Sequence, residues 1–161
     1  MAEKRSAIGK NDRDLLITRV FDAPRELVFK AWTDPEQMAQ WWGPRGFTNP
    51  VCEMDVRPRG ALRIVMRAPD GVEHPMTGVF HEVVEPERLS FTMVAQDQSG
   101  TPVLEGLANA AFAEDGGKTT LTVHAGAVGL VPQAAAMLDG MGEGWSQSLE
   151  RLAELLAKAT R

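Results

Sequence analysis

The sequence has little that would suit a secretory setting. It contains a single cysteine, Cys52, so no disulfide can form within the chain. Its first fourteen residues hold no apolar run that could act as a signal peptide. We therefore expect a cytoplasmic protein, kept in a reducing environment.

Long apolar stretches and basic clusters are also missing. No run approaches the roughly 20 apolar residues that cross a bilayer, so the sequence predicts no membrane insertion. The formal net charge is −5, and the Lys and Arg residues form no cluster. Because nucleic-acid binders and proteins that bind anionic membranes need a basic surface, we exclude both classes.

Motifs for metal binding and catalysis are absent too. His74, His81 and His124 lie on different predicted strands, and none has a second ligand at a metal-site spacing. The chain contains no HExxH motif, no GxSxG elbow and no phosphate-binding glycine loop. We therefore expect no metal and no cofactor, and the catalytic residues, if the protein is an enzyme, stay unknown.

Three charged residues fall on predicted central strands: Arg63, Glu82 and Glu105. Such a charge would need a partner if it pointed into a cavity, and it would then become the leading acid-base candidate. Charges on strands more often lie on the solvated face, so we expect that position for these three.

The remaining composition is that of a folded globular protein. The chain has 161 residues, of which 43% are hydrophobic and 24% are charged, a length and balance that suit one hydrophobic core. We expect a disordered or loosely attached lead over residues 1–14 and a single domain over residues 15–158.

The pattern of apolar residues and turn residues predicts an α+β fold. Residues 15–21 read as a first strand, and Asp22 with Pro24, then Asp34 with Pro35, give the start signals of two short helices. Turn clusters at regular spacing separate six further strands, which we place at 51–56, 61–68, 74–84, 89–94, 104–114 and 119–125. In 74–84 the apolar parity changes, which indicates either two partly covered faces or a β-bulge.

The last segment has the strongest signal. Apolar residues from Ala134 to Leu156, with Ser148 among them, fall on one arc of a helix. Gly140, Gly142 and Gly144 weaken its beginning. We favour a helix that begins near 142–145, after a loop or separate turn at 132–140. The alternative is that small residues leave room for a ligand beside Trp145 or let the helix flex as a gate.

Four motifs then give a resemblance. They occur in order over nearly the whole chain, from Leu15 to about Leu156: ITRVFDAPRELVFKAWTDPEQMAQWWGP, EVVEPERLSFT, EDGGKTTLTV and GWSQSLERLAELL. They resemble the family named for homologues of the activator of the ninety-kilodalton heat-shock chaperone ATPase, within the START, polyketide cyclase and birch-pollen-allergen (SRPBCC) superfamily. The resemblance implies a helix-grip fold: a seven-stranded curved antiparallel sheet, two short helices after strand one, and a long C-terminal helix over a cavity.

In many relatives that cavity holds a lipophilic molecule, which directs attention to large apolar side chains. Trp41 and Trp42 form an aromatic cluster with Phe47 near one mouth of the cavity, and flexible Met side chains suit a deformable wall. Each could equally be core packing. We expect the ligand-binding residues to be Trp42, Phe47, Met66, Phe80, Met137, Met141 and Trp145.

Three functions remain open at this point. The first is the binding of a small hydrophobic or amphipathic ligand, and the second is a cyclase- or dehydratase-type enzyme that uses the same cavity. The third is an interaction protein, either a homodimer or a chaperone partner. The eukaryotic chaperone activators carry a large additional N-terminal domain where this chain has a short polar lead, so we do not expect chaperone interaction.

Overall fold

A computed structural model describes residues 12–159, which form a curved seven-stranded sheet with helices on its concave face. The strand order is β1-β7-β6-β5-β4-β3-β2, and every neighbouring pair is antiparallel. The strands are β1 (Asp12–Phe21), β2 (Thr48–Met54), β3 (Ala61–Arg67), β4 (Glu73–Val84), β5 (Arg88–Gln96), β6 (Pro102–Asp115) and β7 (Lys118–Gly129). The predicted α+β fold is confirmed.

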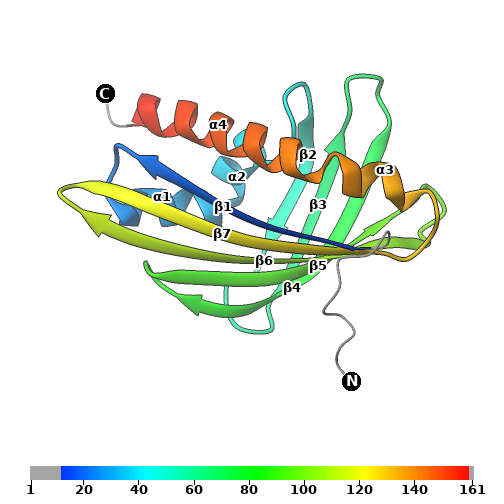
Figure 1. Cartoon of the computed structure of the whole chain (residues 1–161), viewed down its shortest axis with the longest axis horizontal. Helices are drawn as coiled ribbons and strands as arrows, with labels where there is room; N and C mark the ends of the chain where they lie inside the picture. Colours follow the sequence, from blue (N-terminus) through cyan, green and yellow to red (C-terminus); the bar gives the residue numbers. More distant parts are fainter. Residues whose placement is uncertain (1–11, 160–161) are drawn as a thin grey trace.

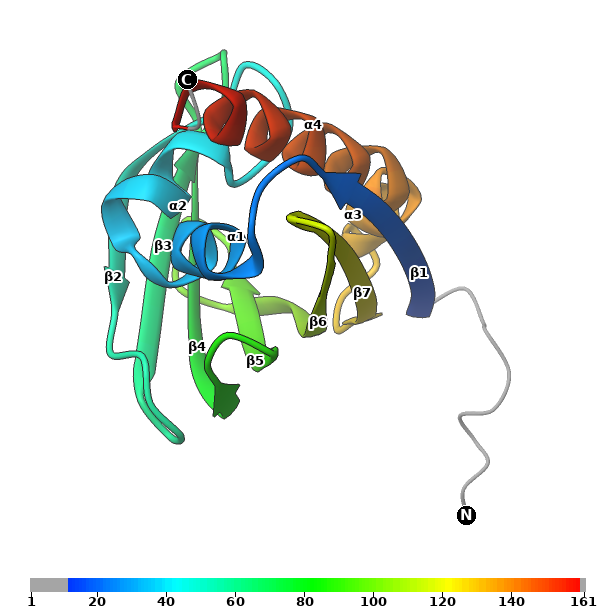
Figure 2. The same ribbon diagram turned by 90° about the vertical axis from the view of Figure 1, so that its left-hand side faces the viewer.

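Four helices occupy the concave side: α1 (Arg25–Thr33), α2 (Pro35–Trp41), α3 (Ala134–Asp139) and α4 (Met141–Ala159). In Figure 1, α1 and α2 lie at one end of the sheet, α3 lies at the other, and α4 runs between them. Figure 2 shows the sheet curling around α1 while α4 crosses the open side. The space between sheet and α4 is therefore filled from one end by α1 and α2.

The starts of the first two helices differ from each other. The carboxylate of Asp34 accepts the N–H of Glu36 at 3.0 Å and caps α2, as its sequence predicts. The N-cap of α1 is Pro24 rather than Asp22, and its side chain makes no capping bond. The Arg25 N–H is instead bound by the Glu114 carboxylate of β6 at 2.8 Å, so tertiary contact replaces a local cap.

Two features of the strands could be determined only from the structure. β1 begins at Asp12 and pairs there with Val128, so 12–14 belong to the sheet rather than to the expected lead. The rest of that lead, residues 1–11, lies outside the described residues. In β4 the pairing register shifts between Phe80 and Glu82, so the bulge is the correct one of the two alternatives.

The C-terminal segment is two helices rather than one. α3 ends at Asp139, Gly140 forms the junction, and α4 runs without a break from Met141. The favoured alternative is thus correct in substance: a separate turn of helix precedes the long helix, which begins one residue earlier than the expected range. The buried side chains of α4 include Leu149, Leu152 and Leu156.

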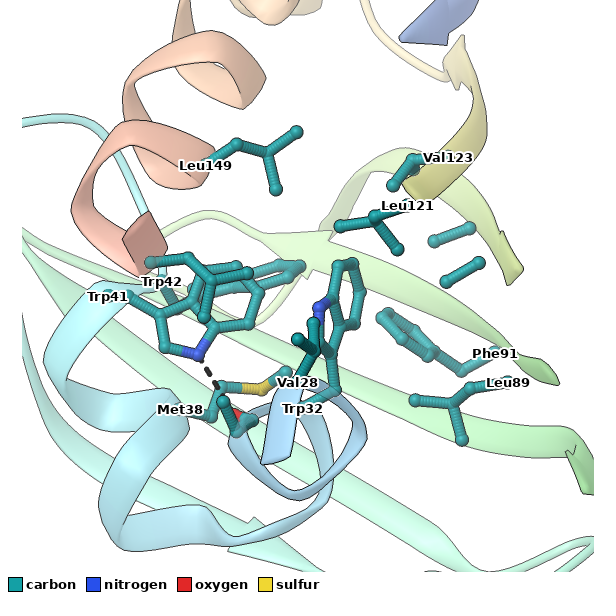
Figure 3. Close-up of a cluster of buried hydrophobic side chains, with 14 of the residues drawn as sticks. Val28, Trp32, Met38, Trp41, Trp42, Leu89, Phe91, Leu121, Val123 and Leu149 are labelled. Atoms are coloured by element: carbon teal, nitrogen blue, oxygen red, sulfur yellow. Dashed lines mark hydrogen bonds between the residues drawn. The ribbon is translucent and has the colours of Figure 1, made fainter. Parts of the chain in front are cut away.

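The core centres on tryptophans from α1 and α2. Trp32 and Trp41 are both 0% exposed, and their ring centroids lie 4.9 Å apart. Figure 3 shows them between the strands and Leu149 of α4. The dashed line there is the Trp41 indole N–H, which donates to the Ala31 carbonyl at 2.9 Å. This cluster fills one half of the concave face and leaves the other half for a pocket.

Candidate functional site

The pocket lies between the sheet and the α3–α4 junction and has a volume of about 440 Å³. That volume falls within the range of about 300–1,000 Å³ typical of small-molecule sites. Its wall includes Met137, which is 39% exposed, so the pocket reaches the protein surface. Its floor is formed by β4 to β7, with Met76, Phe91, Ala108 and Ala127 among the floor residues.

Six of the seven side chains that the sequence predicts as ligand contacts lie in this wall. They are Trp42, Phe47, Met66, Met137, Met141 and Trp145. The structure brings them together from five places in the chain: α3, α4, β3, the residue after α2, and the loop before β2. Their position makes ligand contact a proposal that the geometry supports.

Phe80 is the exception, and it lies outside the pocket wall. Its side chain is 1% exposed and packs against Phe91 with ring centroids 5.8 Å apart. The two residues pair across the β4–β5 ladder, and Phe91 is the one that lines the pocket. Phe80 faces inward, but at the end of the sheet that the tryptophan core fills.

Several wall residues were missed from the sequence. Met76, Met93 and Phe91 lie in the wall but were not among the predicted ligand contacts. The two polar side chains in the wall, His74 and Ser148, were also missed as site residues. Ser148 had a usable signal, because it is a polar residue within the apolar arc of α4.

The aromatic part of the wall is built on the core. Trp145 stacks on Trp32 with centroids 6.1 Å apart and an interplanar angle of 19°. It also meets Trp42 edge to face at 5.5 Å and 81°. Because Trp32 is fully buried, it gives Trp145 a fixed surface to lie on. The pocket wall is therefore continuous with the core at this end.

The loop after α2 is tied to α4 by polar contacts. The Arg151 guanidinium donates to the carbonyls of Trp42, Gly43 and Pro44 through Nη1, at 2.9–3.1 Å, and to Gln40 through Nη2 at 2.9 Å. Burial lowers the pKa of this guanidinium from its ordinary value, but an arginine stays charged at neutral pH. The half-buried guanidinium of Arg151 thus binds four successive or nearby backbone carbonyls of this loop.

Further contacts complete this attachment. The Gln147 side chain accepts the Arg45 N–H at 3.0 Å, and the Arg45 guanidinium meets Glu154 at 2.6 Å. Gly43 is buried with φ of +96°, and an added Cβ would lie 3.0 Å from the Met66 sulfur. Only glycine fits here without strain, so the loop can pass close to the pocket.

The wall carries almost no charge. His74 is the one side chain in it of an ionisable type. Arg63, Glu82 and Glu105 are exposed, as expected, and do not line this pocket. Among residues 12–159 no group of three or more His, Cys, Asp or Glu side chains could hold a metal ion. Cys52 lies outside the wall, and burial raises the pKa of its thiol to about 11, so it is a poor nucleophile.

A second hollow, of about 710 Å³, lies on the outer face of the sheet across β1, β7, β6 and β5. Its wall contains Asp12, Arg13, Asp14 and Glu105. The Asp14 carboxylate is already bound to the His124 ring at 2.6 Å. Charged side chains on an uncovered sheet face do not enclose an apolar ligand, so the smaller concave pocket is the better candidate site.

Comparisons with known proteins agree with this geometry. The sequence profile of a family described as "Activator of Hsp90 ATPase homolog 1-like protein" matches residues 22–157. None of the curated proteins matches the chain. Within the described residues, no helix is long and apolar enough to cross a membrane.

Solved structures from several bacteria have the same fold. A protein from Nitrosomonas europaea is 27% identical with a TM-score of 0.73, and the match covers 96% of this chain and 99% of that one. A protein from Chromobacterium violaceum is 29% identical with a TM-score of 0.74, over 88% and 95% of the two chains. The AHSA1 protein from Silicibacter pomeroyi is 26% identical with a TM-score of 0.74, over 91% and 99%.

Proposed function

The chain belongs to the family of activator of Hsp90 ATPase homolog 1-like proteins, and from this premise we propose that it binds a small, largely apolar molecule in the concave pocket. The observation that carries the proposal is the wall itself: a volume of about 440 Å³ surrounded by aromatic, methionine and alanine side chains. A pocket of this size and polarity gains free energy when an apolar ligand displaces its water.

An enzyme of the cyclase or dehydratase type is not the function that the wall favours. Such a reaction needs groups that give and take protons near the substrate. His74 is the one ionisable side chain in the wall, and no second acid or base stands beside it there. Ligand binding needs no such group, so it remains the proposal.

The test is native mass spectrometry of protein purified from its own host, followed by denaturing extraction. We expect a retained small molecule with a mass that fits the pocket. A matched pair of variants on β6 sharpens the result. Ala108→Phe places a ring at the pocket floor and should abolish retention, whereas Ala113→Phe lies on the exposed outer face and should not.

Circular dichroism shows whether both variants are folded. An empty wild-type protein in repeated preparations, with no binding of added apolar dyes, would contradict the proposal. Equal retention by Ala108→Phe and wild type would place the ligand elsewhere on the protein.

A further inference from the structure

Ser148 is a buried polar side chain in an apolar wall. It lies on α4, is 5% exposed, and lines the pocket. Its Oγ accepts the Gly43 N–H at 3.0 Å. A hydroxyl also has one hydrogen to donate, and no residue within 12–159 accepts it. The pocket therefore contains an unused hydrogen-bond donor.

A second unused donor lies directly behind the wall. The indole N–H of Trp32 is buried and has no hydrogen-bond partner among the described residues. Its ring stacks on Trp145 and lies 6.4 Å from Phe91, and both of these residues line the pocket. Buried donors without an acceptor are rare in folded proteins, so the Trp32 N–H calls for an explanation.

The two donors restrict the chemistry of a ligand. A ligand that offers only donors, such as an ammonium group, would leave both hydrogens unused. A carboxylate would bring a buried charge, and no Lys or Arg side chain stands in the wall to pair with it. An uncharged acceptor oxygen satisfies a hydroxyl donor without a charge to desolvate.

We propose that the ligand carries a neutral acceptor oxygen, such as the carbonyl of a ketone or ester, and that Ser148 Oγ–H donates to it. This inference rests on the proposed function. The apolar body of the ligand lies against Trp42, Phe91 and Met141. Ser148 and Trp145 are three residues apart on one helix face, and both line the pocket.

The test compares ligands that differ in one group. 2-Decanone has a carbonyl where 2-methyl-1-decene has a C=CH₂ group, and decanoate adds a charge. Each displaces Nile red, an uncharged dye that fluoresces in apolar surroundings, from the wild type and from Ser148→Ala. We expect Ser148→Ala to weaken 2-decanone roughly three- to tenfold, as the loss of one hydrogen bond would, and to change the alkene less than twofold.

Two further variants serve as controls. Ser148→Thr keeps the hydroxyl and should retain the ketone response of the wild type. Ser146→Ala removes a hydroxyl from the same helix outside the pocket wall, where it accepts from Arg19 at 3.1 Å, and should leave all ligands unchanged. The affinity of Ser148→Ala for the alkene shows whether the loss of the Gly43 contact distorts the pocket, because the alkene has no oxygen for the hydroxyl to bind.

The outcomes separate the two proposals. If the ketone and the alkene weaken equally in Ser148→Ala, the hydroxyl does not bind the oxygen and this inference is wrong, while apolar binding stands. Stronger binding of decanoate than of 2-decanone would also overturn it, in favour of an anionic ligand. If neither the dye nor any ligand binds, the proposed function itself fails, and this inference with it.

Discussion

Trp32 and Trp41 pack in the same cluster, but their indole N–H groups are in different states. Trp41 donates to the Ala31 carbonyl, while Trp32 has no acceptor. The Ala31 carbonyl would ordinarily accept from the residue four positions later in a helix. That residue is Pro35, which has no N–H, so Trp41 supplies the missing donor.

This difference makes the two tryptophans a matched pair. Trp41→Phe and Trp32→Phe remove similar ring volume, but only Trp41→Phe leaves a buried carbonyl unpaired. We expect Trp41→Phe to lower the free energy of unfolding by about 1–3 kcal/mol more than Trp32→Phe does. Urea unfolding of both variants measures it. Equal losses would mean that the Trp41 bond contributes nothing beyond packing.

At the same scale, some site residues were readable from the sequence and others were not. Trp42 and Trp145 stand out because large aromatics beside a helix end or on an apolar arc must face the interior. Phe80 was also expected to contact the ligand, yet it lies in the filled half of the concave face. Periodicity gives the direction of a side chain but not which half of the interior it reaches.

Among the elements, the α3–α4 junction contains glycines that weaken a helix and also forms part of the pocket wall. Gly142 and Gly144 both lie inside α4. An added Cβ at Gly142 would meet nothing within 4 Å, whereas at Gly144 it would lie 3.7 Å from Pro44 and face the pocket. Both glycines therefore lower the stability of the helix, but only Gly144 adjoins the pocket.

Replacing each glycine separates the two effects. Gly142→Ala and Gly144→Ala should each raise the free energy of unfolding by about 0.5–1 kcal/mol, since alanine favours a helix more than glycine does. Only Gly144→Ala should weaken ligand binding, which dye titration measures. Unchanged affinity in Gly144→Ala would show that its small size serves neither ligand space nor gating.

Arg151 determines how firmly the loop after α2 holds to α4. Arg151→Lys keeps the charge but loses the planar fork that reaches four carbonyls at once. We expect a loss of about 1–3 kcal/mol in the free energy of unfolding, together with weaker ligand binding. The control is Arg45→Lys, an exposed pair with Glu154, which should change stability little. A similar effect in both variants would refute the special role of Arg151.

Element order was largely predictable, whereas element ends were less so. Turn clusters and apolar parity gave seven strands because one face of the sheet is buried. The start of β1 at Asp12 was missed because charged residues occupy an edge strand without penalty. The α1 cap was wrong because a distant carboxylate, that of Glu114, binds its first N–H, and no local pattern encodes that contact.

For the whole molecule, we propose that residues 15–158 unfold as one domain. The tryptophan cluster joins α1, α2 and α4 to the centre of the sheet. Loss of any of these elements would expose the others' apolar surface, so we expect one cooperative transition. Tryptophan fluorescence and far-ultraviolet circular dichroism should then give the same urea midpoint. Separate midpoints would indicate two independently folding parts.

The pairing of β1 with β7 also affects how the chain folds while it is being synthesised. It joins Phe21 to Thr119 and Asp12 to Val128, so roughly one hundred residues separate the partners, which slows their encounter. A ribosome releases β1 long before β7 exists. Until then β1, with Leu16 and Val20 remaining exposed even in the finished sheet, has no strand to pair with. Nascent chains of this protein are therefore most open to mispairing with one another just before synthesis of β7.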